Sequence, residues 1–104
     1  MNEITYVERE KVYASAIKAF GEEAQMVVAL EELSECQKEI CKFLRGIGNA
    51  GNLAEEIADA TIMLEQMRLI FGLNEPVCQK MEQKIRRLDE RLARCSANGE
   101  VIME

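Results

Sequence analysis

Hydrophobic side chains recur every three or four residues through four segments of the chain, and this spacing predicts four amphipathic α-helices. The first helix has a capping-box signature, because Thr5 is followed three residues later by Glu8. Asn52 and Glu55 give the third helix a similar start. The predicted helices cover residues 6–20, 22–45, 53–71 and 75–95, and residues 96–104 form a tail without periodicity. We therefore predict a single all-α, four-helix, bundle-like domain over residues 1–104.

The apolar stripes of these helices indicate how they pack. The apolar stripe along the second helix comprises Met26, Leu30, Leu33, Ile40 and Leu44, and it is widened by Val27, Cys36 and Phe43. The third helix is apolar around most of its circumference, which four short helices cannot cover alone, so we expect a homodimer or a homotetramer. The fourth helix carries a strict heptad seam formed by Cys78, Met81, Ile85, Leu88, Leu92 and Cys95. We expect this seam to pack on the same chain or on a partner.

Composition and charge narrow the possible functions. The 104 residues have 48% hydrophobic side chains, no histidine and a formal net charge of −6, which argues against a nucleic-acid or anionic-membrane partner. No apolar run approaches the roughly 18 residues that cross a bilayer, and the N-terminal residues lack the apolar core of a signal peptide. The four cysteines have no CxxC spacing, so neither a zinc site nor a disulfide framework is predicted. We expect a cytoplasmic protein.

The candidate functional residues are acidic side chains in apolar surroundings. Glu31, Glu32 and Glu35 directly follow an apolar run in the second helix. Asp59 has apolar neighbours on nearly every side of the third helix, so we expect it to face the bundle interior. Glu32 and Glu35 are three residues apart, as are Glu56 and Asp59, and each pair shares a helix face. Because a short glycine-rich loop joins the two helices, they should lie antiparallel, and four carboxylates could meet between them.

Two explanations of such a cluster stay open at this point. Apposed carboxylates repel one another, and shared protons or divalent cations relieve the repulsion. A ligand set made only of oxygens, without histidine, favours Mg²⁺ or Mn²⁺ over Zn²⁺. In the structural alternative, Glu35 pairs with Lys38 or Lys42, and a hydroxyl such as that of Thr61 caps Asp59.

The spacing of these acids resembles a known family signature. EELSE from Glu31 to Glu35, then 20 intervening residues, then EIAD from Glu56 to Asp59 resemble the EExxE, spacer, ExxD motif of MazG-like nucleoside triphosphate pyrophosphohydrolases. The resemblance extends over about residues 13–92 and is greatest to the short, single-domain members of phages and prophages. It implies an all-α, homo-oligomeric enzyme that uses Mg²⁺, or Mn²⁺ as a substitute. Its expected reaction is hydrolysis of a nucleoside or deoxynucleoside triphosphate between the α- and β-phosphates.

The resemblance also assigns roles to individual residues. By motif position, the expected metal ligands are Glu32, Glu35, Glu56 and Asp59. Glu31 matches the first acid of the motif and is either an additional ligand or a base for the attacking water. A basic stripe on the fourth helix is compatible with a solvated face that pairs with a neighbouring subunit, and it also offers substrate phosphate-binding candidates, namely Lys84, Arg87 and Arg91. The alternative function is a non-catalytic helical oligomerisation or interaction protein with a structural carboxylate cluster.

Overall fold

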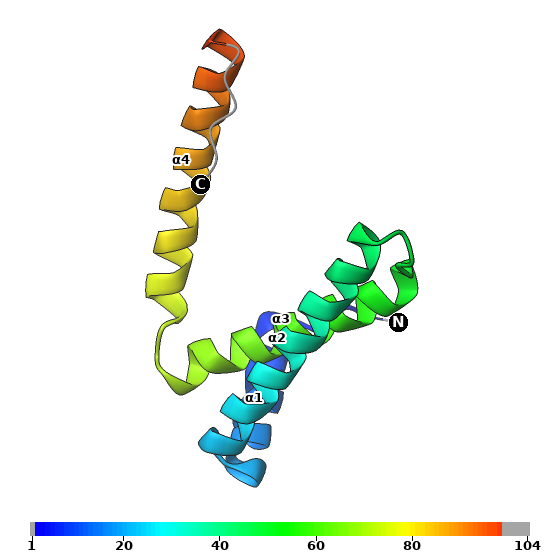
Figure 1. Cartoon of the computed structure of the whole chain (residues 1–104). Helices are drawn as coiled ribbons and strands as arrows, with labels where there is room; N and C mark the ends of the chain where they lie inside the picture. Colours follow the sequence, from blue (N-terminus) through cyan, green and yellow to red (C-terminus); the bar gives the residue numbers. More distant parts are fainter. Residues whose placement is uncertain (1, 99–104) are drawn as a thin grey trace. The chain divides into compact units, whose positions relative to one another are not determined.

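The computed structural model describes residues 2–98, and these residues form four α-helices without a β-strand (Figure 1). The helices are α1 (Tyr6–Phe20), α2 (Glu22–Leu44), α3 (Ala50–Ile70) and α4 (Asn74–Asn98). The prediction of an all-α fold is confirmed. The first three helices form one compact unit, and α4 belongs to a second unit that begins at Asn74. No helix in the described part of the chain has the length and apolarity that crossing a membrane requires.

The helix ends show which local signals the chain uses. At α1 the predicted capping box is present, since Thr5 Oγ1 accepts from the Glu8 amide at 3.2 Å and Glu8 Oε2 accepts from the Thr5 amide at 2.8 Å. The predicted start of α3 is wrong by three residues, because Asn49 is the N-cap and its Oδ1 accepts from the Asn52 amide at 3.0 Å. An Asn at this position caps the helix as well as Asn52 would, and it does so one turn earlier.

The C-terminal end of α4 also differs from the expectation. The helix continues three residues past Cys95, to Asn98, so the first part of the predicted tail is helical. Ser96 and Ala97 have adequate helix propensity, and no glycine or proline lies between Cys95 and Asn98. The rest of the predicted tail, residues 99–104, lies outside the described residues.

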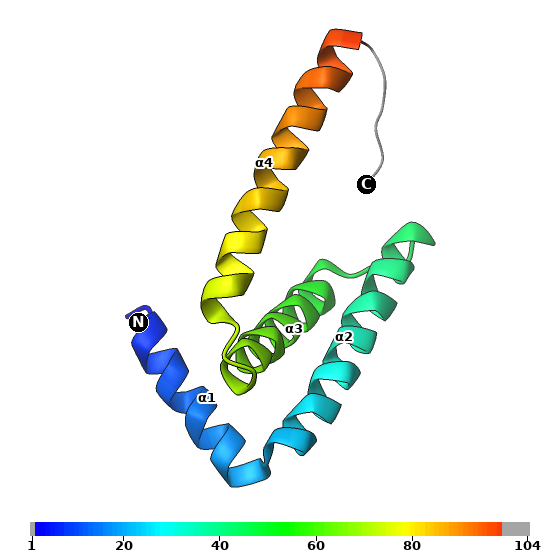
Figure 2. The same cartoon turned by 90° about the vertical axis from the view of Figure 1, so that its left-hand side faces the viewer.

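Two helices of the first unit form an antiparallel hairpin. α2 and α3 lie side by side and run in opposite directions, and α1 packs against both of them (Figure 2). The chain leaves α2 through Gly46, whose φ of +78° is a left-handed conformation that glycine adopts without strain. The Ile47 amide closes this turn by donating to the Lys42 carbonyl at 3.0 Å. This tight turn reverses the chain so that α3 runs back along α2, as the glycine-rich loop predicted.

The interior of the first unit is small and partly polar. Its buried apolar residues are Tyr13, Ala29, Ala60 and Met63, and its buried polar residues are Gln25, Glu39 and Gln66. The predicted buried stripe of α2 is wrong at Leu30, which is 69% exposed, and at Leu44, which is 85% exposed, whereas Met26 and Cys36 are half-buried. The most buried positions of α2 form a different stripe, which follows Gln25, Ala29, Glu32, Cys36 and Glu39. Both faces of α2 contain apolar and polar residues. The face that is buried is the one whose side chains find contacts on α3.

A polar contact joins α1 to α3. The Tyr13 hydroxyl donates to Glu65 Oε1 at 2.5 Å, and Arg9 Nε lies 3.3 Å from the same oxygen. Burial of Tyr13, together with this hydrogen bond and the negative charge of Glu65, raises the pKa of Tyr13 to about 12. The three residues therefore form a partly buried network in which the tyrosine stays protonated.

Candidate metal centre

Carboxylates from α2 and α3 converge between the two helices. Glu32 comes from α2, and Glu56 and Asp59 come from α3. One carboxylate oxygen from each of the three residues lies within 4.8 Å of the other two. Oxygen ligands of an octahedral Mg²⁺ ion lie about 3.0 Å apart when adjacent and about 4.2 Å apart when opposite, so a limit of 4.8 Å is compatible with the ligands of one ion. We call Glu32, Glu56 and Asp59 the acidic trio.

The position of the trio follows from the stripe by which each helix packs. Glu32 lies on the buried stripe of α2, one turn after Ala29. Glu56 lies one turn before Ala60, which is buried on α3. Both glutamates are therefore half-buried, at neighbouring levels of the same helix pair. The apolar positions around Asp59 predicted an interior location, but Asp59 is exposed, since it lies on the flank of that stripe rather than at its centre.

The electrostatics of the trio are unfavourable for three bare carboxylates. Partial burial raises the pKa of Glu32 above its usual value, and the charges of Asp59, Glu35 and Glu31 raise it further. A hydrogen bond between the Glu32 and Asp59 side chains acts in the same direction. Partial burial and the neighbouring negative charges therefore both oppose ionisation of Glu32.

Glu56 has the same character. Partial burial raises the pKa of Glu56, and the charges of Glu32, Asp59, Glu35 and Glu39 raise it further. Its Oε2 atom is buried and accepts no hydrogen bond from the described residues. An unsatisfied carboxylate oxygen is costly in a protein interior, and a hard divalent cation is a partner that satisfies it. The donor set, made entirely of carboxylate oxygens, fits Mg²⁺ or Mn²⁺.

Two predicted site residues lie beside the trio rather than in it. Glu35 is exposed, yet it is close enough for its charge to raise the pKa of both Glu32 and Glu56. Glu31 is also exposed, and its charge acts on Glu32. The fourth carboxylate expected between the helices is therefore at the rim of the cluster.

Glu39 is a sixth acid near the cluster, and the sequence reasoning missed it. It is 7% exposed, and its charge raises the pKa of Glu56. Lys42 Nζ lies 3.0 Å from Glu39 Oε1, whereas Glu39 Oε2 is buried and accepts no hydrogen bond from the described residues. The signal was present in the sequence, since Glu39 lies seven residues after Glu32 and so shares its helix face.

The contacts proposed in the structural alternative are not the ones formed. Lys42 pairs with Glu39, and among the described residues no ion pair joins Glu35 to Lys38 or to Lys42. The Thr61 hydroxyl donates to the carbonyl of Ile57 at 2.7 Å, within its own helix. Neither residue therefore compensates the acidic trio in the way that a purely structural cluster requires.

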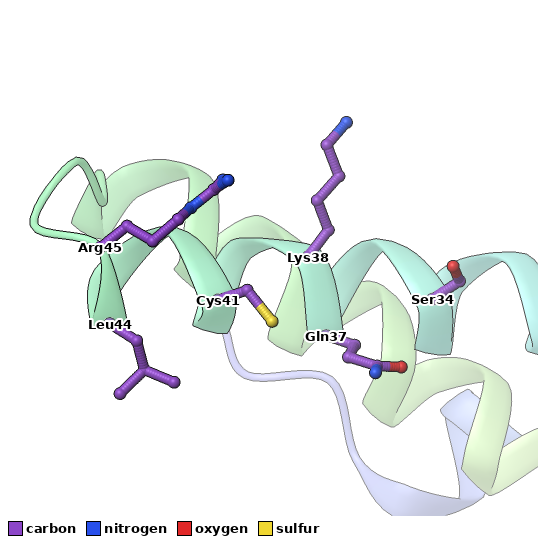
Figure 3. Close-up of a pocket in the computed structure, with 6 residues that line it drawn as sticks. All are labelled: Ser34, Gln37, Lys38, Cys41, Leu44 and Arg45. Carbon is purple, nitrogen blue, oxygen red and sulfur yellow. The ribbon is translucent and has the colours of Figure 1, made fainter.

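Basic residues contribute two further surface features. Lys84 and Arg87 line a hollow on α4 together with Lys80 and Gln83, and Arg91 is half-buried further along the same helix. A separate hollow on α2 is lined by Ser34, Gln37, Lys38, Cys41, Leu44 and Arg45 (Figure 3). No residue of the acidic trio lines either hollow, so each is distinct from the candidate metal centre.

Comparisons of the chain with protein-family models, with curated proteins and with solved structures found no match. The resemblance to MazG-like enzymes therefore rests on the motif residues alone. Of these, Glu32, Glu56 and Asp59 converge, and Glu35 lies at their rim.

Proposed function

We propose that the chain is a Mg²⁺-dependent nucleotide pyrophosphohydrolase of the MazG-like family. Its substrate is a nucleoside or deoxynucleoside triphosphate, which it hydrolyses between the α- and β-phosphates to a monophosphate and pyrophosphate. The observation that carries the proposal is the convergence of Glu32, Glu56 and Asp59 within 4.8 Å at positions that match the two halves of one motif. A buried, unpartnered oxygen of Glu56 supports a cation there.

In this proposal the chain supplies geometry and negative charge. Glu32, Glu56 and Asp59 would hold the ion, and Glu35 would join them from the rim. When bound, Mg²⁺ neutralises phosphate oxygens and lowers the pKa of a water molecule. Glu31, which is exposed next to Glu32, would be the base that takes the proton of the attacking water. Lys84, Arg87 and Arg91 remain candidates for contacts to phosphates.

The second candidate function is a non-catalytic helical interaction protein. The observation that favours it is the exposure of large apolar side chains, including Leu30 at 69% and Ile85 at 60%. In that case the acidic trio is a structural cation site, and the protein acts by presenting its apolar helix faces to a partner.

Product analysis separates the two functions. The purified chain is incubated with each common nucleoside and deoxynucleoside triphosphate and Mg²⁺, and pyrophosphate and orthophosphate are measured separately. We expect pyrophosphate and a monophosphate, no reaction in chelator, and recovery with Mg²⁺ or Mn²⁺. Release of orthophosphate alone would contradict cleavage between the α- and β-phosphates, and no product with any nucleotide would favour the interaction protein.

A pair of matched variants assigns the activity to the cluster. Glu56→Gln keeps the shape of the side chain but binds a hard cation poorly, so activity should fall more than about tenfold. Glu55→Gln removes the same charge from the adjacent, exposed position of α3 and should leave activity nearly unchanged. Circular dichroism checks that both variants keep their helices.

A further inference from the structure

The heptad seam of α4 presents exposed apolar side chains along its central part. Every residue from Cys78 to Glu90 is exposed. The central seam residues have exposed fractions of 51% for Met81, 60% for Ile85, 42% for Leu88 and 59% for Leu92. The residues from Cys78 to Cys95 form a stripe about 26 Å long. A continuous apolar stripe of this kind normally marks an interaction surface.

The residues of the seam suit a pair of helices. In heptad notation, Cys78, Ile85 and Leu92 take position a, and Met81, Leu88 and Cys95 take position d. A β-branched residue at a, such as Ile85, combined with leucine at d, such as Leu88, favours two-stranded coiled coils. The covering element is therefore best matched by one helix with the same period, and a second copy of α4 has that period.

The charges beside the seam distinguish the two possible orientations of a second α4. Position e carries the acidic residues Glu82 and Asp89, and position g carries the basic residues Lys84 and Arg91. In a parallel pair, position g of one helix faces position e of the next heptad in the partner, so Lys84 meets the Asp89 of the other copy. By symmetry this attractive pair occurs twice. In an antiparallel pair, g faces g and e faces e, which places like charges together on both sides.

We propose that α4 pairs with the α4 of a second copy of the chain as a parallel, two-stranded coiled coil. The proposal rests on the exposed seam, the residue types at a and d, and the charge complementarity at e and g. It does not require the proposed enzymatic function, and it gives Lys84 and Arg91, named above as candidates for contacts to phosphates, an alternative role beside the seam. An intrahelical ion pair of 2.7 Å between Arg86 and Glu82 supports the helical conformation that the pairing requires.

The cysteines of α4 report the orientation directly. Cys78 and Cys95 carry thiols at opposite ends of the seam. In the parallel pair Cys78 faces Cys78 and Cys95 faces Cys95 across the interface, whereas full antiparallel overlap places Cys78 opposite Cys95. Three single-thiol chains are made by changing the other three cysteines to serine, keeping Cys78, Cys95 or, as a control for random collision, the exposed Cys41 of α2.

Each single-thiol chain is treated with diamide, which oxidises two thiols to a disulfide, and is run on a non-reducing gel. We expect rapid cross-linked dimers from the Cys78 chain and from the Cys95 chain, and slow cross-linking of the Cys41 chain. Cross-linking only in a mixture of the Cys78 and Cys95 chains would show antiparallel pairing and overturn the proposal. Cross-linking no faster than the Cys41 control would also overturn it.

A charge-reversal series tests the same pairing without cysteine variants. Lys84→Glu places two acids opposite each other and should raise the dimer dissociation constant at least about tenfold. Adding Asp89→Lys restores an attractive pair and should return the constant to within about threefold of the wild type. Lys80→Glu makes the same charge change at position c, outside the seam flanks, and should have little effect. Sedimentation or light scattering gives the mass, with 11.8 kDa as the monomer.

Three results of this series would overturn the proposal. A wild-type chain that stays at 11.8 kDa at all concentrations excludes the pairing. Equal effects of Lys84→Glu and Lys80→Glu, or no rescue by Asp89→Lys, would show that the flank charges do not meet as proposed. Circular dichroism on each variant shows that α4 remains helical, so loss of the dimer is not loss of the helix.

Discussion

Gln25 of α2 and Gln66 of α3 are joined by a buried hydrogen bond, in which Gln25 Nε2 donates to Gln66 Oε1 over 2.6 Å. Gln25 is 6% exposed and Gln66 is 5% exposed. A slip of either helix along the other would leave both amides unsatisfied in the interior, which is costly. The bond therefore fixes the register of the helix pair that also brings Glu32 and Glu56 together.

Breaking this amide pair on one side should destabilise the chain. Gln66→Met keeps the side-chain volume but leaves the Gln25 amide without its partner, so the free energy of unfolding should fall by about 1–3 kcal/mol. The double variant Gln25→Met with Gln66→Met removes both polar groups and should recover most of that loss. Urea denaturation followed by circular dichroism measures both. A double variant less stable than Gln66→Met would contradict this account.

Neutralising one member of the acidic trio should stabilise the chain in chelator. Asp59→Asn removes a charge that raises the pKa of Glu32 and Glu56, so mutual repulsion falls and the melting temperature should rise by about 2–6 °C. Millimolar Mg²⁺ should stabilise the wild type and stabilise Asp59→Asn much less. Differential scanning fluorimetry with and without Mg²⁺ measures both effects.

The control for that experiment is Glu55→Gln, which removes an exposed charge one residue before the cluster and should keep the response to Mg²⁺. An Asp59→Asn chain that is less stable in chelator, with no response to Mg²⁺ in either protein, would contradict the metal centre. It would favour a structural role for Asp59 instead.

The cluster should also make stability depend on pH in the acid range. The pKa of Glu32 and of Glu56 is raised in the folded chain, so the folded state binds protons that the unfolded state releases above pH 4.5. In chelator, what these two groups contribute to the free energy of unfolding is present below that pH and is lost as the pH rises toward neutrality. Glu56→Gln should weaken this dependence. Urea midpoints between pH 5 and 7.5 measure it, and an equal slope in wild type and Glu56→Gln would contradict the prediction.

Tyr13 should produce a separate dependence in the alkaline range. Because its pKa is raised to about 12 from 10.0, the stability it provides is present below pH 10 and is lost as the pH rises through its folded-state pKa. The stability difference between wild type and Tyr13→Phe should therefore shrink above pH 10, with a slope of up to about 1.4 kcal/mol per pH unit. Urea unfolding at pH 9 to 11.5 measures it. A constant difference would mean that Tyr13 ionises normally.

The fold could be predicted where a local signal decides it. The reciprocal bonds of Thr5 and Glu8 depend only on a four-residue spacing, and the exit from α2 depends on the conformational freedom of Gly46. The buried face of α2 could not be predicted in the same way. Leu30 and Leu44 are apolar and exposed, whereas Gln25 is polar and buried because its partner, Gln66, comes from another helix. Periodicity shows that a helix has an apolar face, but not which face finds a partner.

The candidate site was predicted more fully than the core. Spacing along two helices and an antiparallel connection were enough to place Glu32, Glu56 and Asp59 together. The exposure of Asp59 was missed, because its apolar neighbours in sequence are not the residues that cover it in space. Glu39 was missed because the motif ends at Glu35, although the helix face continues beyond it.

The hairpin of α2 and α3 also limits how the two acidic pairs can be separated along a chain. Of the 20 residues between Glu35 and Glu56, nine continue α2 and six begin α3, which leaves a loop of five, Arg45 to Asn49. Inserting one residue between the loop and the acids of α2 or α3 rotates those acids by about 100° about the helix axis, so that they no longer face the other pair. Inserting about seven residues, which is two helical turns, into both helices brings the two acidic pairs to face each other again. The loop itself can lengthen with little cost. Spacers that are compatible with this pairing therefore differ in the length of the loop, or by two helical turns in each of the two helices.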